Sequence, residues 1–406
     1  MDLMHTGRWT GALAVLALAG CQEAVTAPGV CPEYCPGTSI DVADSVLAGS
    51  VVSDTTYTGY VGPWAAGAIY LAADPAGSGP RSRGVVRFPA FSERLVIASG
   101  DTTTAPAVTD SLQLQVTVRR RFASATGLRV AVYRLPAAVD SLVAFDDLEP
   151  QFMDSARVGA IAIPDSLVSG ALTVVLPASA FPSFDADARV AALGLALEGS
   201  AGPAFADLAT AEAGAGASMV RYATIDSAGT PVTRTDGHDR PALDLYVTTG
   251  VPAPAGATLA VGGAPSSRTF LGFDIPPGVL DSAQIVRATV ALVPAGPIVG
   301  VPGDTVTMLA HSIPADFGAK SPFNPIHPDS VSRRSSHALV GSGDTVFVDV
   351  TDILRRWQTA PAEPRVIVLR ATPEGGSFAE ARFDALGTAA GPALIVTYVP
   401  RLRFGR

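Results

Sequence analysis

The chain has 406 residues and a net charge of −9 at neutral pH, with 48% hydrophobic and only 16% charged residues. Because no excess of basic residues is present to balance phosphate groups, this composition argues against nucleic acid as a partner. The apolar fraction is ample for packed cores, and the length suits two domains of ordinary size.

Residues 1–20 have the features of an export signal. Arg8 precedes an apolar run at 11–17 that is too short to span a bilayer, and small residues follow it. The sequence Leu18-Ala19-Gly20-Cys21 resembles the lipobox of bacterial lipoproteins, although an ordinary signal peptide is the alternative. The resemblance implies cleavage before Cys21 and acylation of its thiol, so we expect a protein held by lipid in the outer membrane or at the cell surface.

Residues 21–45 are polar and interrupted by Pro and Gly, which predicts a flexible tether. If Cys21 is acylated, Cys31 and Cys35 remain as an even pair, and a small disulfide loop is the favoured interpretation. Two free thiols or a metal site are the alternatives, but no His or further Cys lies nearby to complete a metal site.

Beyond the tether, nearly every apolar segment is short, rich in Val, Leu and Thr, and bounded by Gly, Pro, Asp or Ser. Residues 112–118 alternate between apolar and polar side chains, as a half-buried antiparallel strand does. Regularly spaced short strands separated by turn residues predict an all-β fold of sandwich or barrel type.

Two groups of side chains before residue 122 are candidates for ligand binding. Tyr60 and Trp64 lie in an aromatic cluster that is able to stack on a sugar or a protein partner, although Trp64 packing beneath the first strands is the alternative. Arg119, Arg120 and Arg121 form the densest cationic segment, which suits an acidic polysaccharide or simply a solvated turn.

One helix is predicted at residues 353–358, near the end of the chain. Thr351 and Asp352 are placed to cap it, and Pro361 ends it. Ile353, Leu354 and Trp357 share one face, which we expect to close one end of a sandwich.

The chain also repeats itself. Residues 169–184 align without gaps on 342–357, and Ser82-Arg83 with Phe88 matches Ser267-Arg268 with Phe273. We therefore expect two tandem copies of one β unit, at 46–232 and 233–402, each with its own core.

The second copy carries a family resemblance over about residues 266–399. The segments that carry it are Arg268 to Pro276, the stretch Val346-Phe347-Val348-Asp349-Val350-Thr351-Asp352-Ile353-Leu354-Arg355-Arg356-Trp357, Phe378 with Phe383, and Pro392 to Tyr398. Their order resembles the DNRLRE domain of bacterial exported proteins, which is similar to carbohydrate-binding module family 96. The resemblance implies jelly-roll-like antiparallel β-sandwiches, and some relatives bind acidic polysaccharides. The Trp-rich stretch of family members is replaced here by residues 311–324, which contain no Trp.

No arrangement of residues typical of an active site is evident. The sequence lacks a G-x-S-x-G nucleophile elbow, an H-E-x-x-H zinc motif and a phosphate-binding glycine loop. His238 with Asp236 and Asp239 could form a metal site, but a solvated turn is favoured, and His327 suits a surface loop. The acidic residues Asp146, Asp147, Glu149, Asp185 and Asp187 could cleave glycosides or hold a structural Ca²⁺, but solvated acids are the simpler interpretation.

The sequence thus predicts a non-enzymatic envelope lipoprotein without a catalytic metal or cofactor. Its expected partners are the membrane, through the lipid anchor, and a polysaccharide bound outside the cell. The alternative is a structural or assembly role, in which the sandwiches dock on another envelope protein. The ligand, the membrane leaflet and the oligomeric state are left open.

Overall fold

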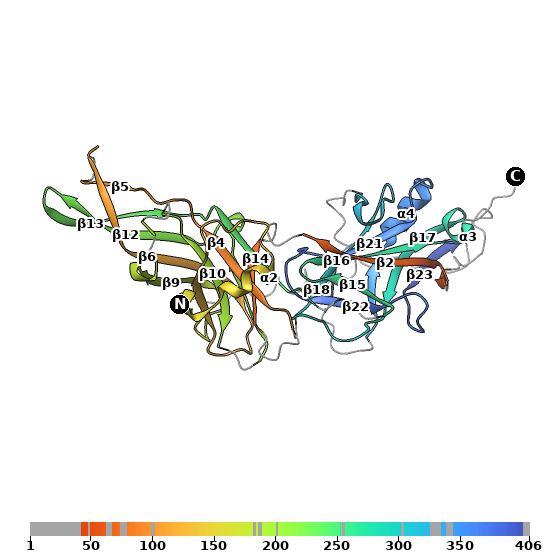
Figure 1. The fold of residues 1–406 in the computed structure, drawn as a ribbon. Coiled ribbons are helices and arrows are strands. Elements are labelled where there is room, and N and C mark those ends of the chain that lie inside the picture. Colours follow the sequence, from red (N-terminus) through yellow and green to blue (C-terminus); the bar gives the residue numbers. More distant parts are fainter. Residues whose placement is uncertain are drawn as a thin grey trace, which may run out of the picture. The chain divides into compact units, whose positions relative to one another are not determined.

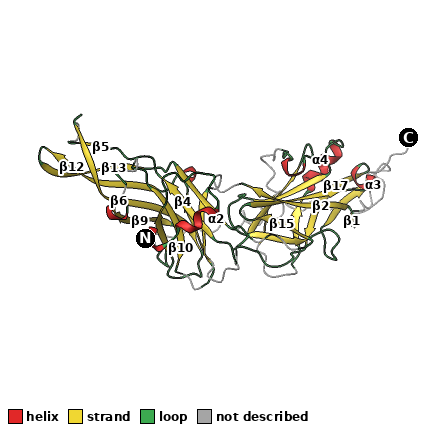
Figure 2. Ribbon diagram, viewed as in Figure 1, coloured by secondary structure: helices red, strands yellow, loops and turns green. Residues whose placement is uncertain are grey.

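The computed structural model describes residues 42–400, except residues 48, 62–66, 74–78, 99–101, 182–183, 186–188, 200–201, 252, 254–255, 302–303, 325–333 and 338–343. Antiparallel strands dominate this part of the chain, and its helices are short (Figures 1 and 2). The predicted all-β class is therefore confirmed. The signal segment, Cys21, Cys31, Cys35 and Trp64 lie outside the described residues.

The strands belong to two sandwiches, which we call A and B. The strands of sandwich A are β3 (Ala68–Ala73), β4 (Ser82–Arg87), β5 (Arg94–Val96), β6 (Thr104–Arg121), β7 (Arg129–Arg134), β8 (Arg157–Ala162), β9 (Gly170–Pro177), β10 (Ala192–Glu198), β11 (Ala204–Ala209), β12 (Ser218–Ser227), β13 (Thr230–His238) and β14 (Leu243–Thr248). The strands of sandwich B are β1 (Ala43–Leu47), β2 (Val51–Tyr60), β15 (Thr258–Gly262), β16 (Ser266–Phe273), β17 (Ala283–Leu292), β18 (Val306–Ser312), β19 (Arg334–His337), β20 (Val346–Asp349), β21 (Val366–Ala371), β22 (Glu380–Asp384) and β23 (Ala393–Pro400). The helices are α2 (Phe145–Leu148), α3 (Pro277–Leu280) and α4 (Thr351–Thr359), with 3₁₀ turns at Glu149–Gln151, Asp154–Ala156, Ala178–Ala180, Ala211–Ala213 and Gly318–Lys320.

Sandwich A is one sheet that folds over on itself. Its strand order is β13-β12-β6-β11-β3-β4-β10-β7-β8, with β9 beside β6 and β14 beside β4. Leu112, Leu114, Val116 and Val118 of β6 are all buried, as their alternation predicts, and they belong to the same core as Leu193 of β10. Inward side chains from opposite halves of the sheet therefore share one interior.

Sandwich B repeats this topology in two separate sheets. One has the order β1-β23-β17-β20, and the other has the order β19-β18-β21-β16-β15-β22, with β2 beside β16. The first order matches β13-β12-β6-β9 of sandwich A, and the second matches β8-β7-β10-β4-β3-β11, with β14 beside β4. The internal repeat predicted from the sequence is thus visible as a repeated strand order.

The two repeats exchange their first two strands. The strands β1 and β2 precede sandwich A in the chain, yet they pair with β23 and β16 of sandwich B. The strands β13 and β14 precede β15, yet they pair with β12 and β4 of sandwich A. Sandwich A is therefore inserted between β2 and β15, and each sandwich is completed by the strand pair that precedes the other one.

This exchange corrects the predicted domain boundaries. The expected tether, 21–45, includes the first residues of β1, which are a strand in the structure. The expected units, 46–232 and 233–402, assign the end of β1 and all of β2 to the first sandwich, and most of β13 with β14 to the second. The strand pairing instead joins 43–60 with 258–400 and leaves 68–248 continuous. Alternating short strands predict the sheets, but equivalent strands of a repeat have equivalent partners, so their pattern does not specify which copy they join.

Hydroxyl groups hold β2 in register on β16. Thr58 Oγ1 lies 3.0 Å from Ser267 Oγ, and Thr56 Oγ1 lies 3.1 Å from Thr269 Oγ1. On the equivalent strand of sandwich A, the Ser82 hydroxyl lies within hydrogen-bond distance of the Val247 carbonyl oxygen, at 3.0 Å. Because Ser82, Ser267 and Thr269 are fully buried, these bonds keep their hydroxyls satisfied in the core.

Helix α4 packs as predicted, but its capping differs from the prediction. Ile353, Leu354 and Trp357 are buried, and the Trp357 ring contacts Phe273, with ring centroids 5.9 Å apart. The helix begins at Thr351, earlier than expected, so Thr351 and Asp352 already lie in its first turn. The Asp349 carboxylate instead accepts a hydrogen bond from the Thr351 backbone N–H at 2.9 Å.

The strand exchange is testable with engineered disulfides in a chain whose native cysteines are replaced by serine. A Thr58→Cys/Ser267→Cys pair should oxidise within the monomer, because the two hydroxyls are 3.0 Å apart across paired strands. In sandwich A the register partner of Ser82 is Thr248. If β2 stayed with its own repeat it would occupy the place of β14, and Thr58 would then face Ser82.

Thr58→Cys/Ser82→Cys is therefore the matched control and should stay reduced. Non-reducing gel electrophoresis with thiol alkylation measures both outcomes. Oxidation of the control pair, with the Thr58/Ser267 pair left reduced, would show that the strands are not exchanged.

Candidate functional site

The three predicted arginines at the end of β6 have different environments. Arg119 donates from Nη1 to the Gly67 carbonyl oxygen. Arg120 pairs with Asp207 and Asp304. The Arg121 side chain is only 5% exposed, and its Nη1 lies 3.2 Å from Asp165. The interpretation as a solvated turn therefore fails for Arg121, whose guanidinium stabilises the loop that follows β6.

Arg119 and Arg120 line a cavity of about 550 Å³, which we call the Arg120 cavity. Its other lining residues come from both sandwiches, and they combine polar side chains and glycines with the apolar residues Ala68, Val306, Ala371, Pro373 and Ala379. They include Gly67, Tyr70, Asp207, Gly262, Gly263, Asp304, Thr305, Thr307, Thr372, Glu374, Gly375, Gly376 and Ser377. The volume lies in the range of small-ligand sites, but the lining is more polar than in most such sites.

Arg120 is the central charge of this cavity. Its Nε donates to Asp207 Oδ2 at 2.8 Å, and its Nη1 donates to Asp304 Oδ2 at 3.0 Å. Asp304 also accepts a hydrogen bond from the Ser377 hydroxyl at 2.9 Å. One guanidinium from sandwich A thus fixes a carboxylate of each sandwich, and the other oxygen of Asp304 accepts a hydrogen bond from the Thr305 backbone N–H at 2.9 Å.

Burial changes the proton affinity of Asp207. Its side chain is 13% exposed, and loss of hydration raises its pKa to about 6. The Arg120 guanidinium opposes this rise, and the negative charge of Asp304 adds to it. A carboxyl group with a shifted pKa in a cavity is a physical sign of a functional site, although ion pairs inside a fold cause such shifts as well.

Aromatic rings form the floor beneath this charged group. Phe378 of sandwich B lies against Tyr70 and Tyr246 of sandwich A, with ring centroids 5.9 Å apart in both pairs. Burial raises the pKa of both tyrosines, so their phenols stay neutral. Tyr70 lines the cavity, and its apolar neighbours exclude water from below the Arg120 pair.

Tyr60 does not offer the exposed ring that the sequence suggests. The Arg268 guanidinium lies over its ring at 3.7 Å, and its hydroxyl donates to the Ala319 carbonyl at 2.6 Å. Arg268 is held in place by Glu374, through bonds of 2.6 and 2.8 Å. Since Glu374 lines the Arg120 cavity, the two predicted groups of ligand-binding residues are linked through this ion pair, with Tyr60 in a supporting role.

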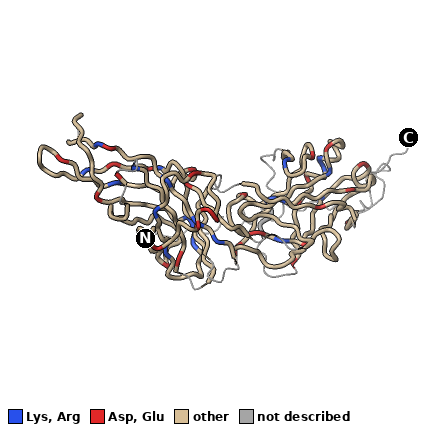
Figure 3. Tube along the Cα trace, in the orientation of Figure 1, with Lys and Arg blue, Asp and Glu red and all other residues tan. Residues whose placement is uncertain are grey.

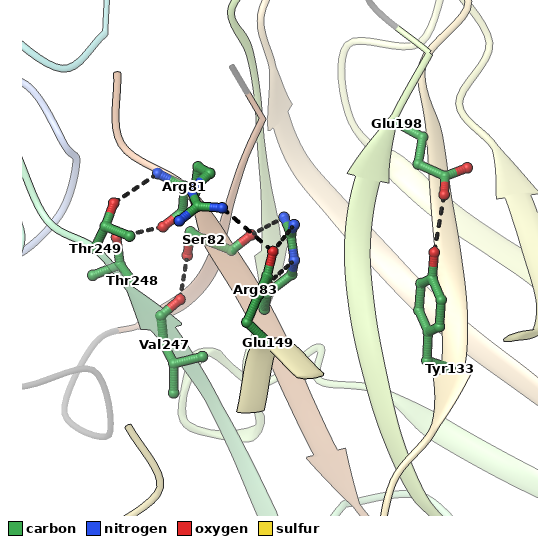
Figure 4. Close-up of polar contacts among 9 residues, drawn as sticks. All are labelled: Arg81, Ser82, Arg83, Tyr133, Glu149, Glu198, Val247, Thr248 and Thr249. Atoms are coloured by element: carbon green, nitrogen blue, oxygen red, sulfur yellow. Dashed lines mark hydrogen bonds and ion pairs between the residues drawn. The ribbon is translucent and has the colours of Figure 1, made fainter. Parts of the chain in front are cut away.

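A similar arginine–glutamate pair occurs in sandwich A, but its glutamate comes from a different element, because Glu198, the equivalent of Glu374 in the repeat, binds Arg157 instead. Arg83, the equivalent of Arg268, makes two bonds of 3.0 Å to Glu149, and Arg81 approaches the same carboxylate at 3.5 Å (Figure 4). Phe145 and Phe152 supply the aromatic contacts there. Figure 4 also shows the Tyr133 hydroxyl directed at Glu198, at 3.1 Å. Glu149 is thus an ion-pair partner and is not placed to serve as a glycosidase acid.

Asp236, His238 and Asp185 are occupied by structural contacts, whereas Asp146, Asp147 and Asp239 are exposed, as the interpretation as solvated acids expects. Asp236 binds the fully buried Arg221, with Nε 2.7 Å from Oδ1, so it is not directed at a shared metal with His238. The His238 ring packs against Phe91 at 4.5 Å. Asp185 accepts hydrogen bonds from the backbone and hydroxyl of Thr109, whereas Asp187 and His327 lie outside the described residues.

Acidic and basic positions are interspersed over the described chain (Figure 3). Within its described residues, no group of three or more His, Cys, Asp or Glu side chains is placed to hold a metal ion. The helices described here are all too short or too polar to cross a membrane.

Comparison with known proteins finds no family model that matches the chain and no curated protein that matches its sequence. Asp207, Asp304 and Ser377 are members of the site that the sequence did not indicate. Asp207 lies in the apolar strand Ala204–Ala209, and Asp304 lies in a Pro- and Gly-bounded loop, so neither shows a motif.

The pKa of Asp207 predicts a pH dependence. In the unfolded chain the pKa of an Asp side chain is about 3.9. Between pH ~4 and ~6, Asp207 is therefore protonated in the folded chain but ionised in the unfolded chain. The free energy of unfolding should therefore decrease as the pH rises through this window, by at most about 3 kcal/mol from this group. An NMR titration with ¹³C-labelled aspartate should show one carboxyl midpoint near pH 6 that Asp207→Asn removes.

Arg120→Met provides the internal control for this titration. Because the guanidinium lowers the Asp207 pKa, its removal should move the same midpoint to higher pH. A midpoint that stays near 4 in the unmodified chain would contradict the burial of Asp207.

Proposed function

We propose that the protein is a non-enzymatic envelope lipoprotein that binds a polysaccharide outside the cell, with the Arg120 cavity as its binding site. The observation that carries this proposal is the convergence of Arg120, Asp207, Asp304 and Ser377 on one polar hollow. A saccharide presents many hydroxyl groups, each both donor and acceptor. Charged groups that already hold one another in place bind such hydroxyls with little loss of side-chain entropy.

The charge of the cavity refines the expected ligand. Two arginines and three carboxylates line it, and Glu374 is neutralised by Arg268. This balance supports a ligand rich in hydroxyl groups more than a strongly acidic polymer. The DNRLRE-like sequence order, including the jelly-roll likeness, supports the same class of function by resemblance alone.

A docking role on another envelope protein is the rival function. Large exposed hydrophobic side chains of the described chain, such as Val46, Val108 and Val175, lie on the separate strands β1, β6 and β9. Contiguous apolar patches are what mark protein interfaces. The polar cavity therefore supports ligand binding more strongly than these scattered side chains support docking.

A glycan array probed with the chain from residue 22 onward tests the proposal. At least one polysaccharide should bind, and Arg120→Met should weaken that binding by about tenfold or more, since each lost charge-assisted bond contributes about 1.5–3 kcal/mol. Arg94→Met is the matched control, because Arg94 is exposed and, among the described residues, its guanidinium is seen bonded to Thr104, away from the cavity.

Three outcomes would contradict the proposal. Absence of binding to every glycan, together with recovery of one envelope protein in a pull-down, would favour docking. Equal binding by the Arg120→Met and Arg94→Met variants would place the site elsewhere. Release of new reducing ends from the bound glycan would show an enzyme.

The lipid anchor is tested separately with Cys21→Ala in the full chain. Loss of the acylated thiol removes the buried methylenes, each contributing about 0.8 kcal/mol to membrane attachment. The variant should fold normally, as judged by circular dichroism, and move from the membrane fraction to the soluble fraction. Retention of the variant in membranes would contradict lipid anchoring.

A further inference from the structure

A second hollow lies on the outer face of sandwich B, away from the Arg120 cavity residues. It has a volume of about 300 Å³ and is lined by Ser53, Thr55, Tyr57, Phe270, Gly272, Asp316, Gly318 and Val366. We call it the Tyr57 groove. The strands β2, β16 and β21 form its floor, and the segment at 316–318 forms one wall.

Two aromatic residues, Tyr57 and Phe270, line the groove among its polar groups. Tyr57 is half-buried and stands edge-on to the buried Phe270, with ring centroids 5.3 Å apart and planes at 82°. Phe317, between two lining residues, is 69% exposed. Rings held in this way offer area for the C–H face of a sugar at little entropic cost.

A glycine lets β2 and β16 contact closely at one end of the groove. A Cβ atom at Gly272 would overlap Ser53 Oγ, so a larger residue would force that hydroxyl to move. Gly272 and Ser53 are register partners on β16 and β2. The Ser53 hydroxyl is thus placed over the backbone of Gly272, which carries no side chain to displace it.

Sandwich A provides an internal comparison, because β14 lies on β4 as β2 lies on β16. The pairs Ser53–Gly272, Thr55–Phe270 and Tyr57–Arg268 of sandwich B correspond to Leu243–Arg87, Leu245–Val85 and Val247–Arg83 of sandwich A. There, Val85, Leu245 and Val247 are buried together with Phe145 and Leu148 of α2. Arg87 donates from Nη1 to the Val139 carbonyl at 2.8 Å.

At this face the side chains of sandwich B are therefore more polar than those of sandwich A. Sandwich A carries apolar side chains and covers them with a helix. Sandwich B carries hydroxyl groups, two aromatic rings and a glycine at the equivalent positions; Phe270 is buried with Ile313 and Val368, whereas Ser53 and Thr55 are exposed. If this face of sandwich B served only for packing, we would expect leucines there, as in sandwich A, and not serine and threonine.

We propose that the Tyr57 groove binds one neutral pyranose ring of a polysaccharide, as a site separate from the Arg120 cavity. Tyr57 supplies the stacking surface, and Ser53, Thr55 and Asp316 supply hydrogen bonds to the ring hydroxyls. The lining contains no Lys, Arg or His, and its single charged residue is Asp316. A uronate carboxylate would meet this negative charge unpaired, so the groove selects against acidic sugars.

This proposal shares its ligand class with the proposed function but rests on its own residues. The test uses the chain from residue 22 onward, labelled with 3-fluorotyrosine, with the Tyr57 ¹⁹F signal identified by Tyr57→Phe. The probes are cellohexaose, mannohexaose and hexamannuronate at millimolar concentration. At least one neutral hexasaccharide should shift the Tyr57 signal with saturation, and hexamannuronate should leave it in place.

The Thr55→Leu variant gives sandwich B the leucine that sandwich A carries at the equivalent position, Leu245. It should weaken the binding reported by the Tyr57 shift by about tenfold, which corresponds to about 1.4 kcal/mol of lost contact. Thr173→Leu makes the same change at an exposed position of β9 and should have no effect. Arg120→Met should also preserve the shift, which separates this site from the cavity. Ser53→Leu replaces Thr55→Leu if circular dichroism shows that the latter misfolds.

Three results would overturn the proposal. One is the absence of a Tyr57 shift with both neutral hexasaccharides. Another is an equal or larger shift with hexamannuronate. The last is loss of the shift in Arg120→Met, which would make the groove an effect of the cavity.

Discussion

The pairing of β2 with β16, and of β14 with β4, is the constraint on which the rest of the structure depends. Each sandwich is completed by strands that precede the other in the chain, so neither sheet closes using its own repeat alone. Thr58 and Ser267, whose hydroxyls meet across this pairing, are 209 residues apart in sequence. Such distant pairing favours slow folding of sandwich B, whereas all strands of sandwich A lie within residues 68–248.

The exchange also explains where the Arg120 cavity forms. The chain crosses between the sandwiches twice, after β2 and after β14, and Gly67 at the end of the first crossing accepts a bond from Arg119. Arg120 then joins Asp207 to Asp304, and Phe378 packs on Tyr70 and Tyr246. Polar and aromatic contacts therefore accumulate at the crossings, and they hold open a hollow whose walls come from both repeats.

The sequence predicted what local periodicity controls. The alternation of β6, the buried face of α4 and the matching of Arg83 with Arg268 are all evident in the printed residues, and each is present in the fold. The strand exchange was not predictable, because Thr58 and Thr248 occupy equivalent positions and suit either partner. The roles of Asp207 and Asp304 were not predictable, because a lone carboxylate has no sequence motif and the fold alone places it beside Arg120.

The two sandwiches have diverged at the equivalent face. Both keep an arginine that is held by a glutamate and covered by aromatic rings, although the glutamates come from different elements. Beside this ion pair, α2 covers the face of sandwich A with Phe145 and Leu148. The equivalent face of sandwich B buries less apolar area, because it carries Ser53, Thr55 and Gly272. Since buried apolar area is the main stabilising term in such sheets, this loss of stability on one copy alone is consistent with a face that is retained for binding.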